Sequence, residues 1–290
     1  MDSREYRLIY SVHTNADIPA DFPQEVRHCR FERAVFVPQD DSDWYTRPPK
    51  FPARLLLLRA RSVSVVSHPT SGLPDIDIPL QELTQLETGC ILLRGWIKFT
   101  TKGRTFEVLY NTRASNPLER FVCLLRERWL QETGSLLTRA APLILGDELD
   151  IKFRNLLHSE LTQEETVVIQ CFQLPIKFDR NLLLVHRVSW QAGHLLALTT
   201  HGRIVWITDD YRQSRAFYAG INRSAPVCIF KSCGLEVIDE RLQLVTSFDG
   251  GNVWRAPVCR VAVDASTFAQ GLLEQVSDLR APKTANKGGS

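Results

Sequence analysis

Apolar and polar residues alternate in two successive runs between positions 91 and 112. In the first run the alternation predicts a strand with one buried face, made of four apolar side chains: Ile91, Leu93, Ile97 and Phe99. The second run, at 105–112, alternates in the same way, and Gly103 between them can take the positive φ of a tight turn. The pattern predicts a β-hairpin that packs one face against a core.

A helix is predicted directly after this hairpin. Asn116 can cap its first turn, and Pro117 suits the first helical position, where no backbone N–H is needed. Apolar residues then recur at helical spacing: Leu118, Phe121, Val122, Leu125 and Trp129. Such a stripe needs a surface to cover it, so we expect the helix to pack on the sheet with Arg128 facing solvent.

Patterns along the rest of the chain predict mostly strands. In the first half they fall at 6–13, 26–37, 55–58 and 63–66. In the second half they fall at 166–172, 182–186, 195–199, 204–208, 226–231, 235–238, 242–248 and 254–258. A short helix is expected near residue 152. The last helix is expected at 264–279, where four apolar residues share one face: Phe268, Leu272, Val276 and Leu279.

The order of these elements indicates two domains in tandem. A chain of 290 residues exceeds the usual size of one domain. The apolar runs that begin at Leu55 and Leu195 are offset by 140 residues, and Leu118 and Phe268 of the two helices by 150. We therefore predict a first domain at 1–140, a linker at 141–150, a second domain at 151–281 and a disordered tail at 282–290. Each domain is expected to fold alone.

Both halves resemble a known fold family. The segment GWIKFTTKGRTFEVLYNTRASNPLERFVCLLR, and later KFRNLLHSELTQEETVVIQCFQLP and HLLALTTHGRIVWI, are similar to uncharacterised bacterial proteins with tandem pleckstrin-homology-like (PH-like) domains. The resemblance implies a mostly β (α+β) fold of two tandem split β-barrels, each capped by a C-terminal amphipathic helix. Lipid-binding members of the superfold carry a basic motif in the first hairpin. That motif is not matched here, because the first strand holds only Arg7 and His13.

Composition and charge argue against several kinds of partner. The formal net charge is +2, from 35 basic and 33 acidic residues. The chain therefore lacks the basic field that attracts nucleic acids, and no nucleic-acid partner is expected. No apolar run approaches the roughly 18 residues of a spanning helix, and the N-terminus lacks a secretory pattern. A cytoplasmic location is expected, with the seven cysteines reduced.

No pattern in the sequence points to catalysis, a cofactor or a metal. Nucleophile-elbow and phosphate-loop motifs are missing. Cys29 lies between His28 and Arg30, but strand alternation would direct these neighbours to the opposite face. Other groups lack ligand spacing: His186, His194 and His201, the pair Cys228 and Cys233, and the pair Asp209 and Asp210. We therefore expect a non-enzymatic protein without cofactors or metals.

A group of arginines is the candidate binding site. Arg54, Arg59 and Arg61 surround the tip of the hairpin at 55–66, and a second group lies on the preceding strand: Arg27, Arg30 and Arg33. If these strands are adjacent, the arginines form an anion-binding edge; the alternative is a solvated turn with ordinary surface charge. The leading hypothesis is a scaffold that binds a protein partner through its PH-like domains. The second is weak peripheral binding to anionic lipid through the arginine-rich hairpin.

Overall fold

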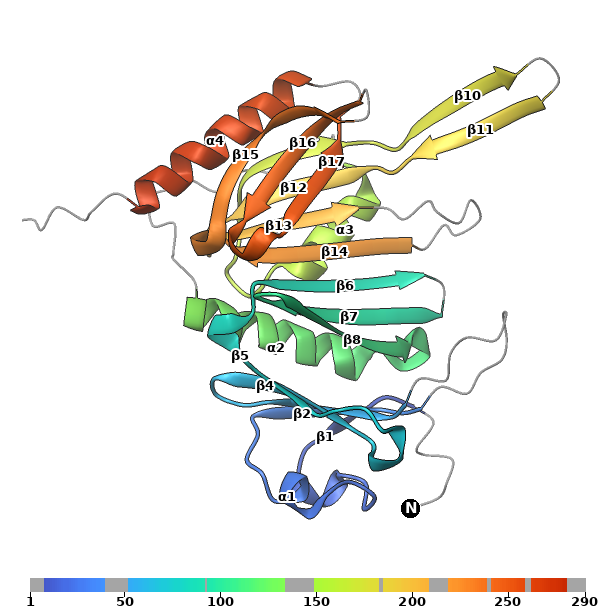
Figure 1. Cartoon of the computed structure of the whole chain (residues 1–290), viewed down its shortest axis with the longest axis vertical. Helices are drawn as coiled ribbons and strands as arrows, with labels where there is room; N and C mark the ends of the chain where they lie inside the picture. The colour runs from blue at the N-terminus through green and yellow to red at the C-terminus, as the bar shows by residue number, and fades with distance from the viewer. Residues whose placement is uncertain are drawn as a thin grey trace, which may run out of the picture.

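The structure is a computed structural model that describes residues 8–39, 52–91, 93–133, 149–182, 185–208, 219–238, 241–258 and 262–280. Within these ranges the chain is mostly β, as predicted, and all of its sheets are antiparallel. The two halves of the chain are stacked along the longest axis of the molecule (Figure 1). No closed barrel is found among the described residues, so the expected pair of barrels is not observed in that form.

The first half consists of a meander, three further strands and a helix. The meander contains β1 (Tyr10–Val12), β2 (Arg33–Val37), β3 (Arg54–Leu58), β4 (Ser62–Ser67) and β5 (Ile76–Pro79), paired in chain order. It is followed by β6 (Gln85–Ile91), β7 (Arg94–Thr101), β8 (Arg104–Asn111) and α2 (Asn116–Thr133). The predicted hairpin is confirmed as β7 and β8, and Gly103 takes a φ of +87° in its turn. The predicted start of its first strand is wrong, because Ile91 ends β6 and Leu93, which is 41% exposed, lies in the turn before β7.

The predicted strand at 26–37 is wrong in its first half. Gln24–Arg27 forms a helical turn, α1, which begins after Pro23, and only β2 is extended. Together with Phe22, this segment covers the outer face of the meander. The coverage explains the unbroken apolar run at 55–58, because Leu55 and Leu57 face this outer cluster while the alternate leucines face the inner core.

The helix α2 covers the inner core of the first half, as its apolar stripe predicts. All five predicted residues are buried: Leu118, Phe121, Val122, Leu125 and Trp129. They pack in one cluster with the inner face of β7 and β8, which presents Ile97, Phe99 and Val108. The Trp129 side chain has no exposed area, and its Nε1 donates a hydrogen bond to the Leu83 carbonyl at 2.9 Å. Arg128 is not simply solvated, since its Nε donates to Glu32 at 2.7 Å.

The second half, like the first, ends in three antiparallel strands followed by a long helix, but the elements before them differ. It begins with α3 (Ile151–Glu160) and continues through β9 (Val167–Gln173), β12 (His194–Thr199), β13 (Arg203–Thr208) and β14 (Ala219–Pro226). Between β9 and β12 in the chain, β10 (Ile176–Leu182) and β11 (Val185–Gln191) form a separate two-stranded ribbon that projects from the body of the second half (Figure 1). The last sheet contains β15 (Phe230–Ile238), β16 (Arg241–Phe248) and β17 (Val253–Pro257), and α4 (Ala262–Arg280) follows it.

Two predicted strands of the second half are wrong. Residues 182–186 are divided between the end of β10 and the start of β11, because one apolar run serves both arms of a hairpin. Residues 226–231 pass from β14 to β15 through a short 3-10 turn, since Pro226 ends the first strand. The stripe of α4 is confirmed where it is described, with Phe268, Leu272 and Val276 buried. The side chain of Leu279 lies outside the described residues.

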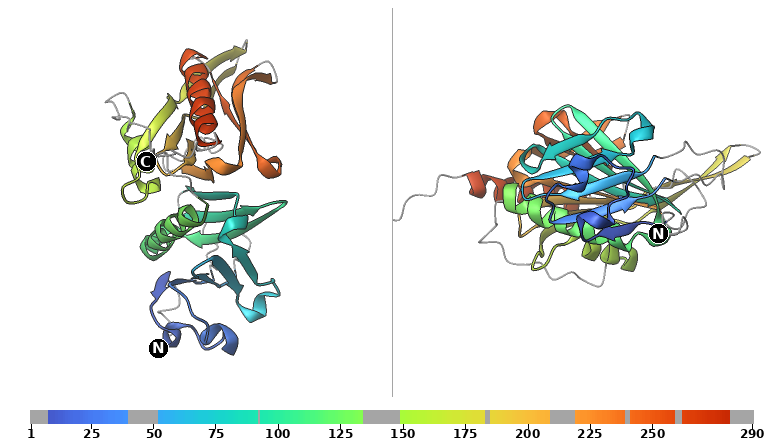
Figure 2. Two further views of the ribbon diagram at one scale, coloured as in Figure 1. Left: turned by 90° about the vertical axis from the view of Figure 1, so that its left-hand side faces the viewer. Right: turned by 90° about the horizontal axis from the view of Figure 1, so that it is seen from below.

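One sheet joins the two halves. Its order is β8-β7-β6-β14-β13-β12-β9, so that β6 of the first half pairs antiparallel with β14 of the second (Figures 1 and 2). The register is continuous from Ala219 opposite Ile91 to Ser224 opposite Leu86. Residues 141–148 of the predicted linker lie outside the described ranges, so the proposed domain limits stay a prediction.

Side chains of the shared sheet change their environment where the halves meet. One face carries, strand by strand, Leu196, Trp206, Arg223, Glu87 and Lys98. The other face carries Leu195, Ile207, Asn222, Thr88 and Ile97. The first row begins in the core under β15–β17, and the second ends in the core under α2. The inner face of one half is therefore the outer face of the other.

Replacing Trp129 tests the packing of α2. In the whole chain, Trp129→Ala is expected to lower the free energy of unfolding by about 3–5 kcal/mol, because it empties a buried aromatic site. Urea denaturation measures the change. The matched control is Arg120→Ala on the exposed side of α2, which should alter stability by no more than roughly 0.5 kcal/mol. Equal losses from the two variants would contradict the packing described above.

Fragments test the pairing between the halves. When 1–133 and 149–280 are produced separately and mixed, we expect a one-to-one complex in size-exclusion chromatography, because each fragment exposes a strand that is paired in the whole chain. The control is the second fragment with Arg223→Glu, which places two carboxylates opposite each other at Glu87 and should weaken the complex. Two folded fragments that remain monomeric together would show that the pairing contributes little.

Candidate functional site

The structure divides the predicted arginine site. Arg54 is opposite Ser67 at one end of the β3–β4 hairpin, whereas Arg59 and Arg61 lie beyond its other end. The expectation that the three arginines surround one tip is therefore wrong for Arg54, because the length of β3 separates it from the tip. Arg33 is the residue that adjoins the tip, since it pairs with the last position of β3.

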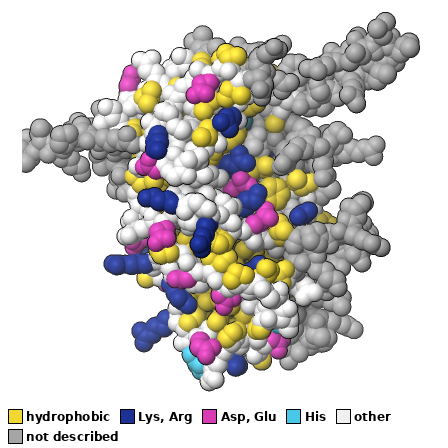
Figure 3. Space-filling view, in the orientation of Figure 1, with side chains coloured by type: hydrophobic (Ala, Val, Ile, Leu, Met, Phe, Trp, Pro, Cys, Tyr) yellow, Lys and Arg dark blue, Asp and Glu magenta, His cyan; other side chains and the backbone are white. Residues whose placement is uncertain are grey.

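Carboxylates accompany the arginines that do lie at the tip. The Nη1 atom of Arg59 lies 3.9 Å from Asp77, and the Nε atom of Arg61 lies 4.0 Å from Glu132. Basic and acidic side chains are also interspersed over the face of the molecule that Figure 3 shows. The tip is therefore a surface of mixed charge, which corresponds to the solvated-turn alternative.

The remaining predicted arginines belong to other environments. Arg27 ends α1, and Arg30 lies in the segment between α1 and β2, so neither is on a strand. Arg54 donates a short hydrogen bond to the Ser67 hydroxyl. Burial lowers the pKa of Arg54, and the nearby Asp75 opposes this effect. These positions make Arg54 a partly buried structural residue.

The histidines and cysteines are likewise not gathered into a site. His194 is buried, and this burial lowers its pKa to about 4, so the ring is neutral at physiological pH. Cys233 is buried and Cys228 is exposed, and burial raises the pKa of Cys233 to about 11. Across the described part of the chain, no three His, Cys, Asp or Glu residues are placed to hold a metal ion. Asp209, Asp210 and the His186 side chain lie outside that part.

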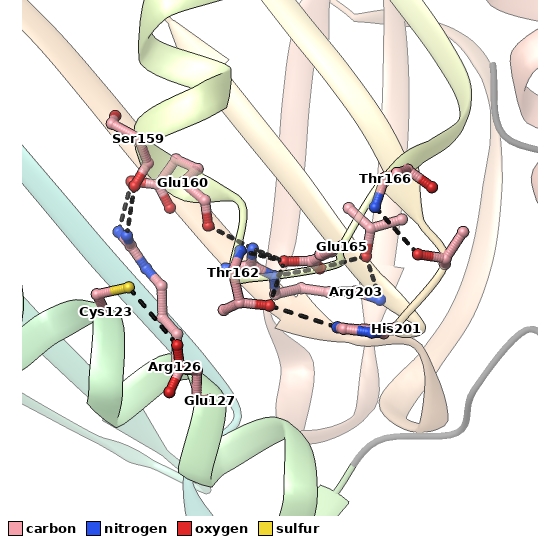
Figure 4. A network of polar contacts seen from close by, with 12 residues as sticks. Cys123, Arg126, Glu127, Ser159, Glu160, Thr162, Glu165, Thr166, His201 and Arg203 are labelled. Carbon is pink, nitrogen blue, oxygen red and sulfur yellow. Dashed lines mark hydrogen bonds and ion pairs between the residues drawn. The ribbon is translucent and has the colours of Figure 1, made fainter. Parts of the chain in front are cut away.

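Sequence reasoning missed a buried ionic network at the junction of the two halves (Figure 4). Arg126 of α2 reaches from the first half to α3, where its guanidinium forms a short ion pair with Glu160. It also donates to the Ser159 carbonyl at 3.2 Å. Asn222 of β14 donates to the same Glu160 oxygen at 2.9 Å, and Thr88 of β6 does so at 3.3 Å. The Glu160 carboxylate of α3 thus binds side chains of α2, β6 and β14.

A second buried pair lies directly behind the first. Arg203 of β13 binds both oxygens of Glu165, with its Nε at 3.1 Å and its Nη2 at 2.6 Å. The Thr162 backbone N–H and the Thr199 hydroxyl donate to the same carboxylate. Burial alone would raise the pKa of Glu165, but the Arg203 charge and these hydrogen bonds outweigh it and hold the pKa below its ordinary value.

A third cluster of charged side chains lies on the opposite face of the seven-stranded shared sheet. Glu87 of β6 is only 5% exposed and accepts hydrogen bonds from Trp96, Lys98 and Arg223, at 2.9, 3.0 and 2.6 Å. The Arg223 guanidinium lies over the Trp206 ring at 4.8 Å. These contacts sit at the point where the same sheet face passes from the core of the second half to the surface of the first.

A cavity of about 470 Å³ lies beside the network, between α2 and two turns of the second half. Its lining includes Glu127, Thr162, Glu164 and His201. The His201 Nδ1 atom lies 3.3 Å from the Thr162 hydroxyl, and Thr162 is itself bound to Glu165. The polar groups on this side are therefore engaged in hydrogen bonds within the second half.

A groove of about 480 Å³ is the more open feature of the second half. It runs between the first strand of the last sheet, β15, and the helix α4. Buried Phe230 and Val276 contribute to it, together with more exposed Leu273 and Lys231. Among the described residues, β15 pairs with β16 alone, so its other edge meets no strand. The sequence holds no local signal for this groove, because it depends on how a helix lies against a distant strand.

Comparison with known proteins adds no identity to this geometry. The sequence matches no family model, and no curated protein is detectably similar to it. None of the helices in the described ranges is both long and apolar enough to cross a bilayer.

The Arg203–Glu165 pair predicts a pH dependence of stability. Because the folded-state pKa of Glu165 is lowered from 4.5, its contribution is present above pH 4.5 and is lost as pH falls through the lowered pKa. Glu165→Gln should lower the free energy of unfolding at pH 7 by about 3–5 kcal/mol, since it leaves Arg203 buried without a countercharge. It should also flatten the decline in stability below pH 4.5.

Chemical denaturation at a series of pH values measures both effects. The matched control is Glu164→Gln, the exposed neighbour, which should leave stability at pH 7 and its acid dependence nearly unchanged. A loss of stability that is the same at every pH in both variants would contradict the role given to Glu165.

Proposed function

We propose that this chain is a non-enzymatic interaction protein built from two PH-like units, and that it binds an extended segment of a protein partner. The partner strand would add to the free edge of β15 and place side chains in the groove beside α4. Such strand addition obtains affinity from backbone hydrogen bonds and selectivity from the pockets that receive alternate side chains.

The order of elements supports the PH-like assignment. In each half a meandering group of strands is followed by three further antiparallel strands and then by one long amphipathic helix, α2 or α4. The helix is packed by its apolar stripe onto the core of its own half. The ribbon β10–β11, the helix α3 and the fifth strand of the first meander are departures from a simple repeat.

The observation that carries the binding proposal is the contrast between β6 and β15. Each is the first strand of the three-stranded group that precedes the long helix, and each has its second strand on one side. On the other side, β6 is paired with β14 over six residue pairs. In the first half, therefore, β14 supplies an antiparallel partner for the outer edge of β6. The corresponding edge of β15 has no partner strand among the described residues.

β15 is the longest edge strand among the described residues. β15 has nine residues, whereas β1 has three and β5 has four and ends in a proline. Short or proline-ended edges resist the addition of strands, and long edges permit it. Val237 on β15 is 73% exposed and Leu273 on α4 is 43% exposed. Apolar side chains are therefore available on both the strand and the helix.

Lipid binding through the arginine-rich hairpin is less favoured. Arg59 and Arg61 each lie within about 4 Å of a carboxylate, and Arg54 is at the opposite end of the hairpin. A phosphate group approaching this tip would have to compete with Asp77 and Glu132.

Selection from a library of random twelve-residue peptides displayed on phage tests the proposal, with the whole chain as the target. Enriched peptides should show alternate apolar residues, as a strand on a one-sided groove requires. Leu273→Glu and Val237→Glu should each weaken their binding by about tenfold or more, as loss of an apolar anchor does. Fluorescence polarisation with one labelled peptide gives the affinities.

The matched control is Ile151→Glu, the same kind of change at an exposed apolar residue on α3. Because α3 packs on the opposite face of the shared sheet from β15–β17, this variant should bind normally. Peptides that bind the Leu273 variant as tightly as the unaltered chain would overturn the assignment of the groove.

A further inference from the structure

A cavity in the first half belongs neither to the junction nor to the groove at β15. Its volume is about 390 Å³, within the range of roughly 300–1,000 Å³ that is usual for small-molecule pockets. One wall is the turn at 15–20, which begins with a short 3-10 helix, η2 (Asn15–Asp17), and the other wall is the end of α1. Figure 1 shows α1 at the end of the molecule farthest from the second half.

Arg27, the last residue of α1, lines this cavity without a countercharge. Its Nε atom is buried without a hydrogen-bond partner among the described residues, and no ion pair joins its guanidinium to any of them. The arginines at the hairpin tip and at the junction, by contrast, each lie beside a carboxylate. A guanidinium that is partly desolvated and unpaired is costly to hold, so its place in a cavity indicates an anionic ligand.

The other polar groups of the lining narrow the class of anion. The Asn15 amide and the His28 ring belong to the lining, and each is able to donate a hydrogen bond. Asp17 belongs to it as well, and its Oδ2 atom accepts hydrogen bonds from the backbone N–H groups of Thr14 and His13, at 2.8 and 3.0 Å. These bonds lower the pKa of Asp17, so its negative charge is kept at physiological pH. That charge favours a ligand with one negative charge over a dianion such as a phosphate.

The rest of the lining is apolar. It consists of Ala16, Ile18, Pro19 and Ala20, of which Ile18 and Pro19 are buried. The cavity thus combines one unpaired cation with a short apolar wall. A carboxylate forms two parallel hydrogen bonds with a guanidinium, and an apolar group attached to the carboxylate would pack against such a wall.

We propose that this cavity binds a small organic carboxylate. The carboxylate pairs with the Arg27 guanidinium, Asn15 and His28 supply further donors, and the apolar body of the ligand contacts the turn at 16–20. The site is independent of the peptide groove, because the two lie in different halves of the chain.

Saturation-transfer difference NMR on the whole chain tests this inference with probes that share a benzene ring. Benzoate should bind. Benzyl alcohol, which has no charge, should bind about tenfold more weakly or less, because it lacks the charged hydrogen bonds. Phenyl phosphate, which carries close to two negative charges at about pH 7.5, should also bind more weakly than benzoate.

Variants of the lining assign the benzoate site. Arg27→Gln should weaken benzoate binding by about tenfold or more, since it removes the charged partner of the carboxylate. The matched control is Arg30→Gln, an exposed arginine that follows α1 and does not line the cavity, and this variant should bind normally. Ala16→Trp is an independent variant, because its larger side chain should fill part of the cavity and weaken binding without a change of charge.

Arg27→Met separates a ligand-binding role from a structural one. Methionine is a long, unbranched and uncharged side chain, so the variant should keep or raise the free energy of unfolding of the ligand-free chain in urea denaturation. It should nevertheless bind benzoate about tenfold more weakly or less, as Arg27→Gln does. An arginine with a structural role would show the reverse pattern.

Several outcomes would overturn the inference. Benzoate could fail to bind the unaltered chain, or it could bind Arg27→Gln and Ala16→Trp as tightly as it binds the Arg30→Gln control. Tighter binding of phenyl phosphate than of benzoate would exclude a carboxylate as the preferred ligand. Lower stability of Arg27→Met with unchanged affinity for benzoate would make Arg27 a structural residue. These outcomes leave the peptide groove untested, because Leu273 and Val237 do not line this cavity.

Discussion

The pairing of β6 with β14 is the interaction on which the rest of this structure depends. It converts the sheets of two successive units into one seven-stranded sheet. Side chains alternate across a strand, so the inner face of one half becomes the outer face of the other at this junction. A purely apolar row would be exposed on one side of the junction, and a purely polar row would be buried on the other. Charged side chains that are buried but paired, such as Glu87 with Arg223 and Glu160 with Arg126, resolve this conflict.

The ionic clusters at the junction follow from that constraint. Burying a charge is costly unless a partner and further hydrogen bonds compensate for it, and a buried pair often adds specificity more than stability. Glu87 has Arg223 directly opposite, and Glu160 on α3 accepts hydrogen bonds from three other elements, α2, β6 and β14. A slip of one residue between β6 and β14 would separate Glu87 from Arg223 and reverse every side chain of the pair. We infer that these clusters select one register for the two halves.

The same view links the groove at β15 to the architecture. Strand addition has already been used once within the chain, at β6, and the corresponding edge of the second half is the long strand β15 beside α4. The ribbon β10–β11 leaves the shared sheet between β9 and β12, away from that groove (Figure 1).

The sequence by itself determined the elements whose patterns are local. The α2 stripe that ends at Trp129 and the β7–β8 hairpin around Gly103 follow from backbone periods of 3.6 and 2 residues, which any chain must obey. Local patterns misassigned 26–37, 182–186 and 226–231, where an apolar run crosses a turn or covers a sheet from outside. Tertiary structure alone decided that Arg54 lies away from Arg59, that Arg126 meets Glu160, and that β6 meets β14. Backbone hydrogen bonds are the same for every strand, so the choice of partner depends on side chains as distant in sequence as Glu87 and Arg223, 136 residues apart.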